Sequence, residues 1–292
     1  MNGVNDERFL FVCLAVSNFR YFNVKKVDGE LRDIEQFRQA LSMVEDFIDN
    51  DQLCGFFSYM IDVKLREENL FNPNKALEHV NETRESLKEL NSRISFTMED
   101  LPDDYTRFRG VRGQSSKHDL IIFNSDMING LRDNQQYFHS RLCTEIFFIF
   151  VKILHELSHA CIIASGRQMN KHNSKRFYTP MTHCLQGDAG WAMERLLFGS
   201  KIDASGYTID DKIIIQYLTF TDGIPSGVID QDWINLFVQD SLNKNKLKIV
   251  QNIERVPFVY LTEALQAKLE GGRKIVKKSY RHSKSFLLDE ND

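Results

Sequence analysis

Hydrophobic positions recur at intervals of three and four over residues 31–50, which is the spacing of one face of an amphipathic helix. A second helical pattern follows over residues 52–68. Asn72 and Pro73 then supply a cap and a first-turn proline for a third helix. We therefore predict a helical N-terminal region over residues 1–95.

The pattern changes beyond this region. Proline and glycines interrupt residues 95–118, which indicates loops or irregular strand. Residues 119–124 are apolar and β-favouring, so they predict a short strand, and Asn129-Gly130 predicts a turn after it. Residues 140–165 then form a helix that is apolar on nearly every side and is expected to end at Gly166. Such a helix is predicted to lie buried in the middle of a domain.

A second helix is predicted from Asp188 to Phe198, with Gly199 just past its end. Residues 212–220 are strand-like, and a further amphipathic helix covers residues 230–242. Helices and strands are therefore mixed along the chain. We predict an α+β fold in which a small mixed sheet packs on the central helix.

We assign residues 96–270 to this core and residues 271–292 to a charged flexible tail. The tail contains a basic cluster of the kind that binds nucleic acid, but its acidic end favours a solvated segment. The whole chain carries 37 Lys and Arg against 41 Asp and Glu, a net charge of −4. No overall basic field therefore favours nucleic acid or an anionic membrane as a partner, and we expect neither.

The five cysteines are widely spaced and odd in number, which predicts neither a disulfide framework nor a thiolate zinc site. A reducing compartment, the cytoplasm, is the expected location. The apolar run over residues 9–16 follows Asp6 and Glu7, so we interpret it as a buried strand and not as a signal peptide. Lys152 interrupts the longest apolar run, so no membrane span is predicted.

The central helix carries the pattern H-E-x-x-H at His155, Glu156 and His159. Two histidines four residues apart project on the same face of a helix and can bind one metal ion, while the glutamate is rotated by about 100°. Buried imidazoles and a carboxylate need partners, and a metal ion would satisfy them together. The alternative is a coincidental pair of buried histidines satisfied by hydrogen bonds.

This motif resembles that of the zincin metallopeptidases. The resemblance implies a zincin-like core that binds Zn²⁺ through His155, His159 and a third residue. Ile162 stands where the metzincins have glycine, so the extended form of their motif is absent. Asp188 resembles the third ligand of the aspzincins and Glu194 that of the gluzincins, and neither match is complete. We favour Asp188, because glycines on either side of it allow a close approach to the site.

The same resemblance implies hydrolysis of a peptide bond in a peptide or protein substrate. Glu156 would be the general base that takes a proton from a zinc-activated water. The predicted strand would lie at the sheet edge and pair with the extended substrate backbone through Leu120, Ile121, Ile122, Phe123 and Asn124. An ordinary core strand is the alternative for these residues. The rival function is a zincin-like protein that binds a partner without turnover.

Overall fold

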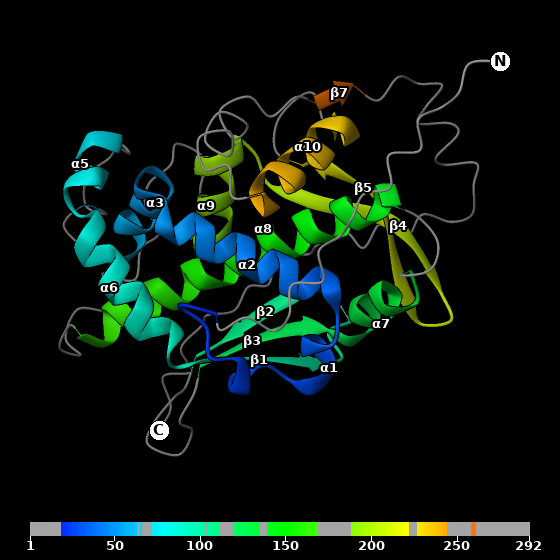
Figure 1. The fold of residues 1–292 in the computed structure, drawn as a ribbon, viewed down its shortest axis with the longest axis horizontal. Coiled ribbons are helices and arrows are strands. Elements are labelled where there is room, and N and C mark those ends of the chain that lie inside the picture. The colour runs from blue at the N-terminus through cyan, green and yellow to red at the C-terminus, as the bar shows by residue number, and fades with distance from the viewer. Residues whose placement is uncertain are drawn as a thin grey trace, which may run out of the picture.

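The computed structural model describes residues 19–62, 65, 72–102, 104–110, 119–134, 139–168, 188–221, 227–243 and 258–260. These residues form helices and two small sheets, which confirms the α+β class (Figure 1). The helices are η1 (Val24–Lys26), α1 (Gly29–Arg32), α2 (Glu35–Asp49), α3 (Asp51–Ile61), α5 (Pro73–Glu78), α6 (Val80–Asn91), α7 (Ser125–Asn134), α8 (His139–Gln168), α9 (Ala189–Phe198) and α10 (Gln231–Leu242). The strands are β1 (Ile94–Glu99), β2 (Thr106–Arg109), β3 (Asp119–Asn124), β4 (Ile202–Ile209), β5 (Lys212–Phe220), β6 (Gly227–Ile229) and β7 (Phe258–Tyr260).

Helix α8 runs through the middle of the molecule and packs against α2, α3, α9 and α10 (Figure 1). Its 30 residues extend two positions beyond Gly166, where the sequence predicted its end. The side chains of residues 146–151 are at most 1% exposed, which confirms the predicted buried helix. Because apolar partners surround this segment, the helix forms the centre of the core.

By length and composition alone, α8 is also long and apolar enough to cross a membrane. In the structure, however, 83% of the apolar window is buried inside the protein. Core helices of soluble proteins have the same properties, so this helix is weak evidence for a membrane span. The cytoplasmic location stays a prediction.

The first sheet has the strand order β1-β3-β2, with β1 parallel and β2 antiparallel to β3. The prediction of a strand at residues 119–124 is confirmed. The prediction that Leu120, Ile121, Ile122, Phe123 and Asn124 lie at the sheet edge is wrong, because β3 is the central strand. Its backbone is hydrogen-bonded on both sides, so an added peptide has no edge of β3 to pair with.

The second sheet has the order β4-β5-β6-β7, and each neighbouring pair is antiparallel. Strand β5 matches the predicted strand at residues 212–220. Asp210 and Asp211 both have positive φ and form the tight turn that joins β4 to β5.

Helix α7 contains Asn129 and Gly130, so the turn predicted there is wrong. A Cβ atom on Gly130 would lie only 2.1 Å from the carbonyl oxygen of Ile213 in β5. The glycine at this position therefore lets α7 pack directly on the backbone of β5 in the second sheet.

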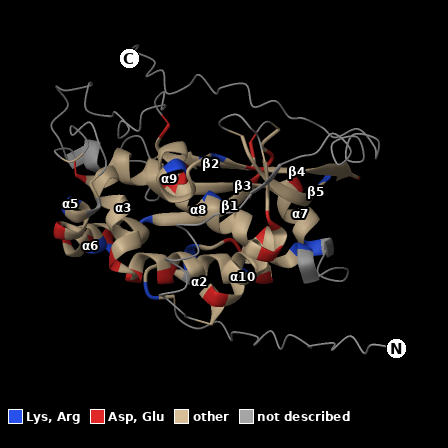
Figure 2. Ribbon diagram, turned by 90° about the horizontal axis from the view of Figure 1, so that it is seen from above, with Lys and Arg blue, Asp and Glu red and all other residues tan. Residues whose placement is uncertain are grey.

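Of the three predicted N-terminal helices, the first is present as α2 and the second as α3, while the third is divided at His79 into α5 and α6. Figure 2 shows charged residues of both signs on α5 and α6. One cluster of buried apolar side chains joins this region to the rest of the protein. Within it, Phe37 of α2 meets Phe123 of β3 edge to face, with ring centroids 5.4 Å apart. The boundary near residue 95 stays a prediction. The strand predicted at residues 9–16 and the tail at 271–292 lie outside the described residues.

Candidate metal centre

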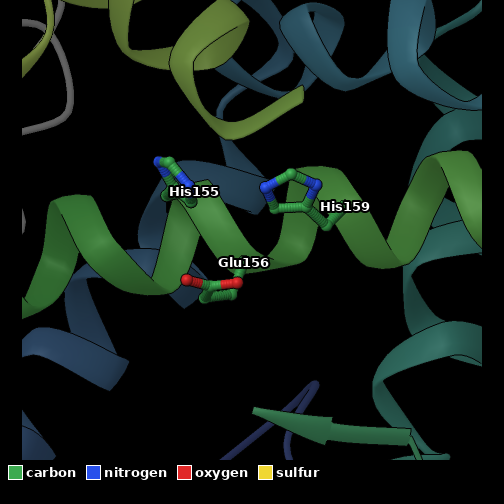
Figure 3. Close-up of side chains that lie close together, drawn as sticks. All are labelled: His155, Glu156 and His159. Carbon is green, nitrogen blue, oxygen red and sulfur yellow. The ribbon is translucent and has the colours of Figure 1, made fainter. Parts of the chain in front are cut away.

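Helix α8 holds both histidines of the H-E-x-x-H motif on the side that faces α9 (Figure 3). The ring centroids of His155 and His159 are 5.1 Å apart. The His155 side chain is 11% exposed and that of His159 is 20% exposed. The pair is thus sheltered by the core but reaches its boundary.

Asp188 lies opposite both rings, at the N-terminus of α9. Its Oδ1 atom is 3.7 Å from Nε2 of His155 and 3.5 Å from Nε2 of His159. Ligands placed tetrahedrally around zinc at its usual bond lengths lie about 3.3 Å from one another. The two distances from Asp188 Oδ1 are therefore a few tenths of an ångström longer than this spacing.

The position of Asp188 is fixed by the helix that it caps. Its Oδ1 atom accepts a hydrogen bond of 2.8 Å from the backbone N–H of Trp191, and Gly199 ends the helix with a φ of 77°. Both ends of α9 are therefore where the sequence predicted them. The helix N-terminus orients one carboxylate oxygen toward the two imidazoles.

The charges in this cluster stabilise one another. Burial alone would raise the pKa of the Asp188 carboxyl, but the charges of His159 and His155 hold it below its usual range. Burial would likewise lower the pKa of His159, but the Asp188 carboxylate raises it above its ordinary value. Asp188 and His159 therefore form an ion pair when the imidazole is protonated, and a metal ion can replace that proton.

Glu194, the other candidate ligand, occupies a different place. Its Oε1 atom lies 2.7 Å from Nδ1 of His155, on the opposite side of the ring from the Nε2 atom that faces Asp188. The residue is 1% exposed. Glu194 is therefore placed to orient His155 through its second ring nitrogen, as carboxylates commonly do in zinc sites.

Two further groups hold the Glu194 carboxylate. Lys152 donates to Oε1 at 2.8 Å, and the backbone N–H of Ile202 donates to Oε2 at 2.7 Å. Burial would raise the pKa of Glu194, but the Lys152 charge and the hydrogen bond with His155 lower it. Sequence reasoning did not include Lys152 in the site. Its signal was a lone lysine in an apolar helix, one turn before the motif.

Gly190 allows α9 to approach the first histidine closely. A Cβ atom at this position would lie 2.1 to 2.3 Å from Cδ2, Cγ and Nε2 of the His155 ring. Any larger side chain would displace the imidazole or the helix. This contact supports the close approach that the sequence predicted from the glycines around Asp188.

The Glu156 side chain projects from α8 on the side opposite the two imidazoles in the view of Figure 3. Its Oε1 atom accepts a hydrogen bond of 2.6 Å from the hydroxyl of Thr106 in β2. His155, Glu156 and His159 each offer one ligand atom within 4.8 Å of the others, so they form a second grouping that could hold a metal. Asp188 Oδ1 lies 3.7 and 3.5 Å from the two Nε2 atoms, whereas the Glu156 carboxylate already has Thr106 as a partner.

The remaining predicted residues lie elsewhere. Ile121, Ile122 and Phe123 are fully buried within the first sheet, and the Asn124 amide oxygen accepts from the backbone N–H of Asp126 in α7. Sequence reasoning did not select Thr106, and it gave the segment that contains β2 as loop or irregular strand. The short, charged segment TRFR gives little sign of a sheet edge without its partner strand.

Comparison of the chain with protein-family models, with curated proteins and with solved structures finds no match.

Proposed function

We propose that this protein is a zinc-dependent metallopeptidase with a zincin-like core. His155, His159 and Asp188 would hold the metal, and Glu156 would be the general base. The observation that carries the proposal is the approach of one Asp188 oxygen to both Nε2 atoms, at 3.7 and 3.5 Å. A chance pair of buried histidines would not require a carboxylate at this spacing from both rings.

The ligand set is typical of a catalytic zinc site, which has three protein ligands and leaves one position for water or substrate. When bound, zinc lowers the pKa of a coordinated water to about 7 and polarises a substrate carbonyl. Glu194 would orient the ligand His155 by accepting a hydrogen bond from its Nδ1–H group. Asp188 and His159 keep 26% and 20% of their side chains exposed, so the described residues leave that side of the site open.

Glu156 is the residue to which we assign proton transfer. It follows His155 directly, is 3% exposed and is held by the Thr106 hydroxyl. A carboxylate in such a place can accept a proton and return it to the leaving amine. Thr106 would limit the rotation of this carboxylate.

An extended substrate would pair with β2. This strand is an edge of the first sheet, and its first residue contacts Glu156. Free backbone groups at a sheet edge bind an extended peptide by forming an added strand. Strand β2 thus takes the role that the sequence had assigned to β3.

One observation favours the rival function, a zincin-like protein that binds a partner without turnover. Glu156 is engaged by Thr106 and lies away from the two imidazoles in Figure 3. If that arrangement persists with metal and peptide bound, the base would be held away from the reacting atoms. Metal binding would then be structural.

Zinc content and peptide cleavage test the proposal together. We expect one zinc per chain in the wild type, loss of zinc in His155→Ala, and zinc retained in Glu156→Gln with cleavage slower by about 10²- to 10⁴-fold. His79→Ala is the matched control, because His79 is a partly exposed histidine of the helical region. Cleavage is measured by mass spectrometry on a mixed peptide library.

The outcomes separate the hypotheses. Substoichiometric zinc, together with unchanged metal content and thermal stability in His155→Ala, would refute the metal site. Full zinc with no cleavage by the wild type would support the binding protein. Cleavage that survives Glu156→Gln would exclude Glu156 as the base.

A further inference from the structure

Lys152 is a buried cation that the proposed reaction does not use. It lies in α8 one turn before His155 and is 8% exposed. Its ammonium donates to Glu194 Oε1 at 2.8 Å and to the carbonyl oxygen of Ile202 at 2.9 Å. It also lies 5.3 Å from the centre of the Phe148 ring.

A buried ammonium is costly unless a carboxylate and hydrogen-bond acceptors compensate it. Here the same carboxylate oxygen that accepts from Lys152 also lies 2.7 Å from Nδ1 of His155. Its other oxygen accepts from the Ile202 N–H. Both oxygens of Glu194 are therefore held, and the carboxylate cannot turn away from the imidazole without losing its bonds to Lys152 and to the Ile202 N–H.

These contacts determine which ring nitrogen of His155 carries the proton. An ionised carboxylate only accepts hydrogen bonds, so Nδ1 must be the donor to Glu194. In a neutral imidazole, Nε2 then has the free lone pair, and this is the nitrogen that faces Asp188. A metal ion requires that lone pair.

We propose that Lys152 is a positioning residue of the metal centre: by holding Glu194 on Nδ1, it keeps His155 in the tautomer whose Nε2 atom is free to bind metal. This inference rests on the proposed metal site. It assigns a role in metal affinity to a residue that touches neither metal nor substrate. Any effect of Lys152 on metal affinity must therefore act through Glu194.

The substitution Lys152→Met removes the charge and keeps a side chain of similar length. In the metal-free protein, ¹⁵N NMR of the imidazole is expected to show the Nδ1–H form of His155 in the wild type and a mixture of tautomers in the variant. Zinc affinity, measured by competition with a chelator, is expected to fall about 10- to 100-fold. The absorption spectrum of the Co²⁺-substituted protein should also differ between Lys152→Met and the wild type.

Three comparisons make the result specific. Lys201→Met is the matched control, because the Lys201 ammonium lies 3.2 Å from the centre of the Trp191 ring, and this variant should keep both tautomer and affinity. In the background of Glu194→Gln, Lys152→Met should lower zinc affinity by less than twofold, because the route through Glu194 is already broken. Lys152→Arg should restore most of the affinity.

An unchanged tautomer and unchanged zinc affinity in Lys152→Met would overturn the inference. If that variant does not fold, Lys152→Gln, which keeps a neutral donor, is measured in the same way and should lose several-fold in affinity. If no form binds zinc but the tautomer still depends on Lys152, the proposed function fails while the positioning role of Lys152 stands. The NMR measurement separates these failures because it needs no metal.

Discussion

The Oδ1 atom of Asp188 lies 3.5 Å from Nε2 of His159, and the same oxygen caps helix α9 through the N–H of Trp191. One atom therefore serves both a helix terminus and the candidate metal centre. The two roles can be separated by substitution, because asparagine caps a helix as well as aspartate but carries no charge.

We predict that Asp188→Asn lowers zinc affinity at least tenfold and leaves helix α9 intact. Asp188→Ala should lose the affinity and also about 1 kcal/mol of unfolding free energy, the usual loss when a cap is removed. Chelator competition and denaturant unfolding of the metal-free protein measure the two effects. Equal zinc affinity in wild type and Asp188→Asn would exclude Asp188 as a ligand.

The ion pair between Asp188 and His159 predicts a pH dependence of stability in the metal-free protein. The pKa of His159 is raised, so its contribution is complete below pH 6.5 and is lost as the pH rises through the raised value. The pKa of Asp188 is lowered, so its contribution is present above its ordinary value of 3.8 and is lost as the pH falls through the lowered value.

The difference in unfolding free energy between wild type and Asp188→Asn should therefore be largest between about pH 4 and 6.5, at roughly 1 kcal/mol, and smaller once the pH exceeds the raised pKa of His159. Urea unfolding with a chelator present measures it at each pH. A difference that stays the same from about pH 5 to alkaline pH would show that the two groups do not interact.

Gly190→Ala should disturb the centre directly. The added Cβ would lie 2.1 to 2.3 Å from atoms of the His155 ring, so the helix or the imidazole must move. We expect a loss of about 1 to 3 kcal/mol in unfolding free energy, together with weaker zinc binding. Gly29→Ala is the control, because a Cβ on Gly29 would meet nothing within 4 Å. Equal stability of the two variants would contradict the packing described.

Thr106→Val removes the hydroxyl that holds Glu156 and keeps the shape of the side chain. If Glu156 is the base, kcat should fall about tenfold with little change in KM, since one hydrogen bond that orients the carboxylate is lost. Thr106→Ser keeps the hydroxyl and should retain most of the activity. A faster Thr106→Val enzyme would instead show that Thr106 restrains Glu156 in an inactive position.

The buried cysteines give a prediction that is independent of function. Burial raises the pKa of Cys54 to about 12 and that of Cys143 to about 11. At pH 8 both should stay protonated and unreactive toward thiol reagents in the folded protein. Mass spectrometry of alkylated peptides should detect these two sites only after unfolding in denaturant. Rapid labelling of either one without denaturant would contradict its burial.

Local signals predicted much of this fold. The extent of α9 follows from a capping aspartate and a terminal glycine, and that of β5 from a run of β-favouring residues. These features depend on neighbours in the sequence, so they can be recognised without the rest of the chain. The motif on α8 was visible for the same reason.

The strand order could not be predicted in this way. Strand β3 is central because β1 and β2 pair with it from both sides, and nothing within residues 119–124 specifies those partners. Likewise, Asp188 and Glu194 lie on one helix, six positions apart. Which ring nitrogen of His155 each one faces depends on how α9 packs against α8.

The contacts of Lys152 also determine the order in which the centre can form during synthesis. Helix α8 is complete at residue 168, but Lys152 and Nδ1 of His155 gain their carboxylate only when residue 194 is available. The last donor to that carboxylate is the N–H of Ile202. A growing chain that has passed only residue 168 therefore carries a lysine and two histidines whose partners have not yet been made, and we expect it to take up metal poorly until strand β4 has left the ribosome.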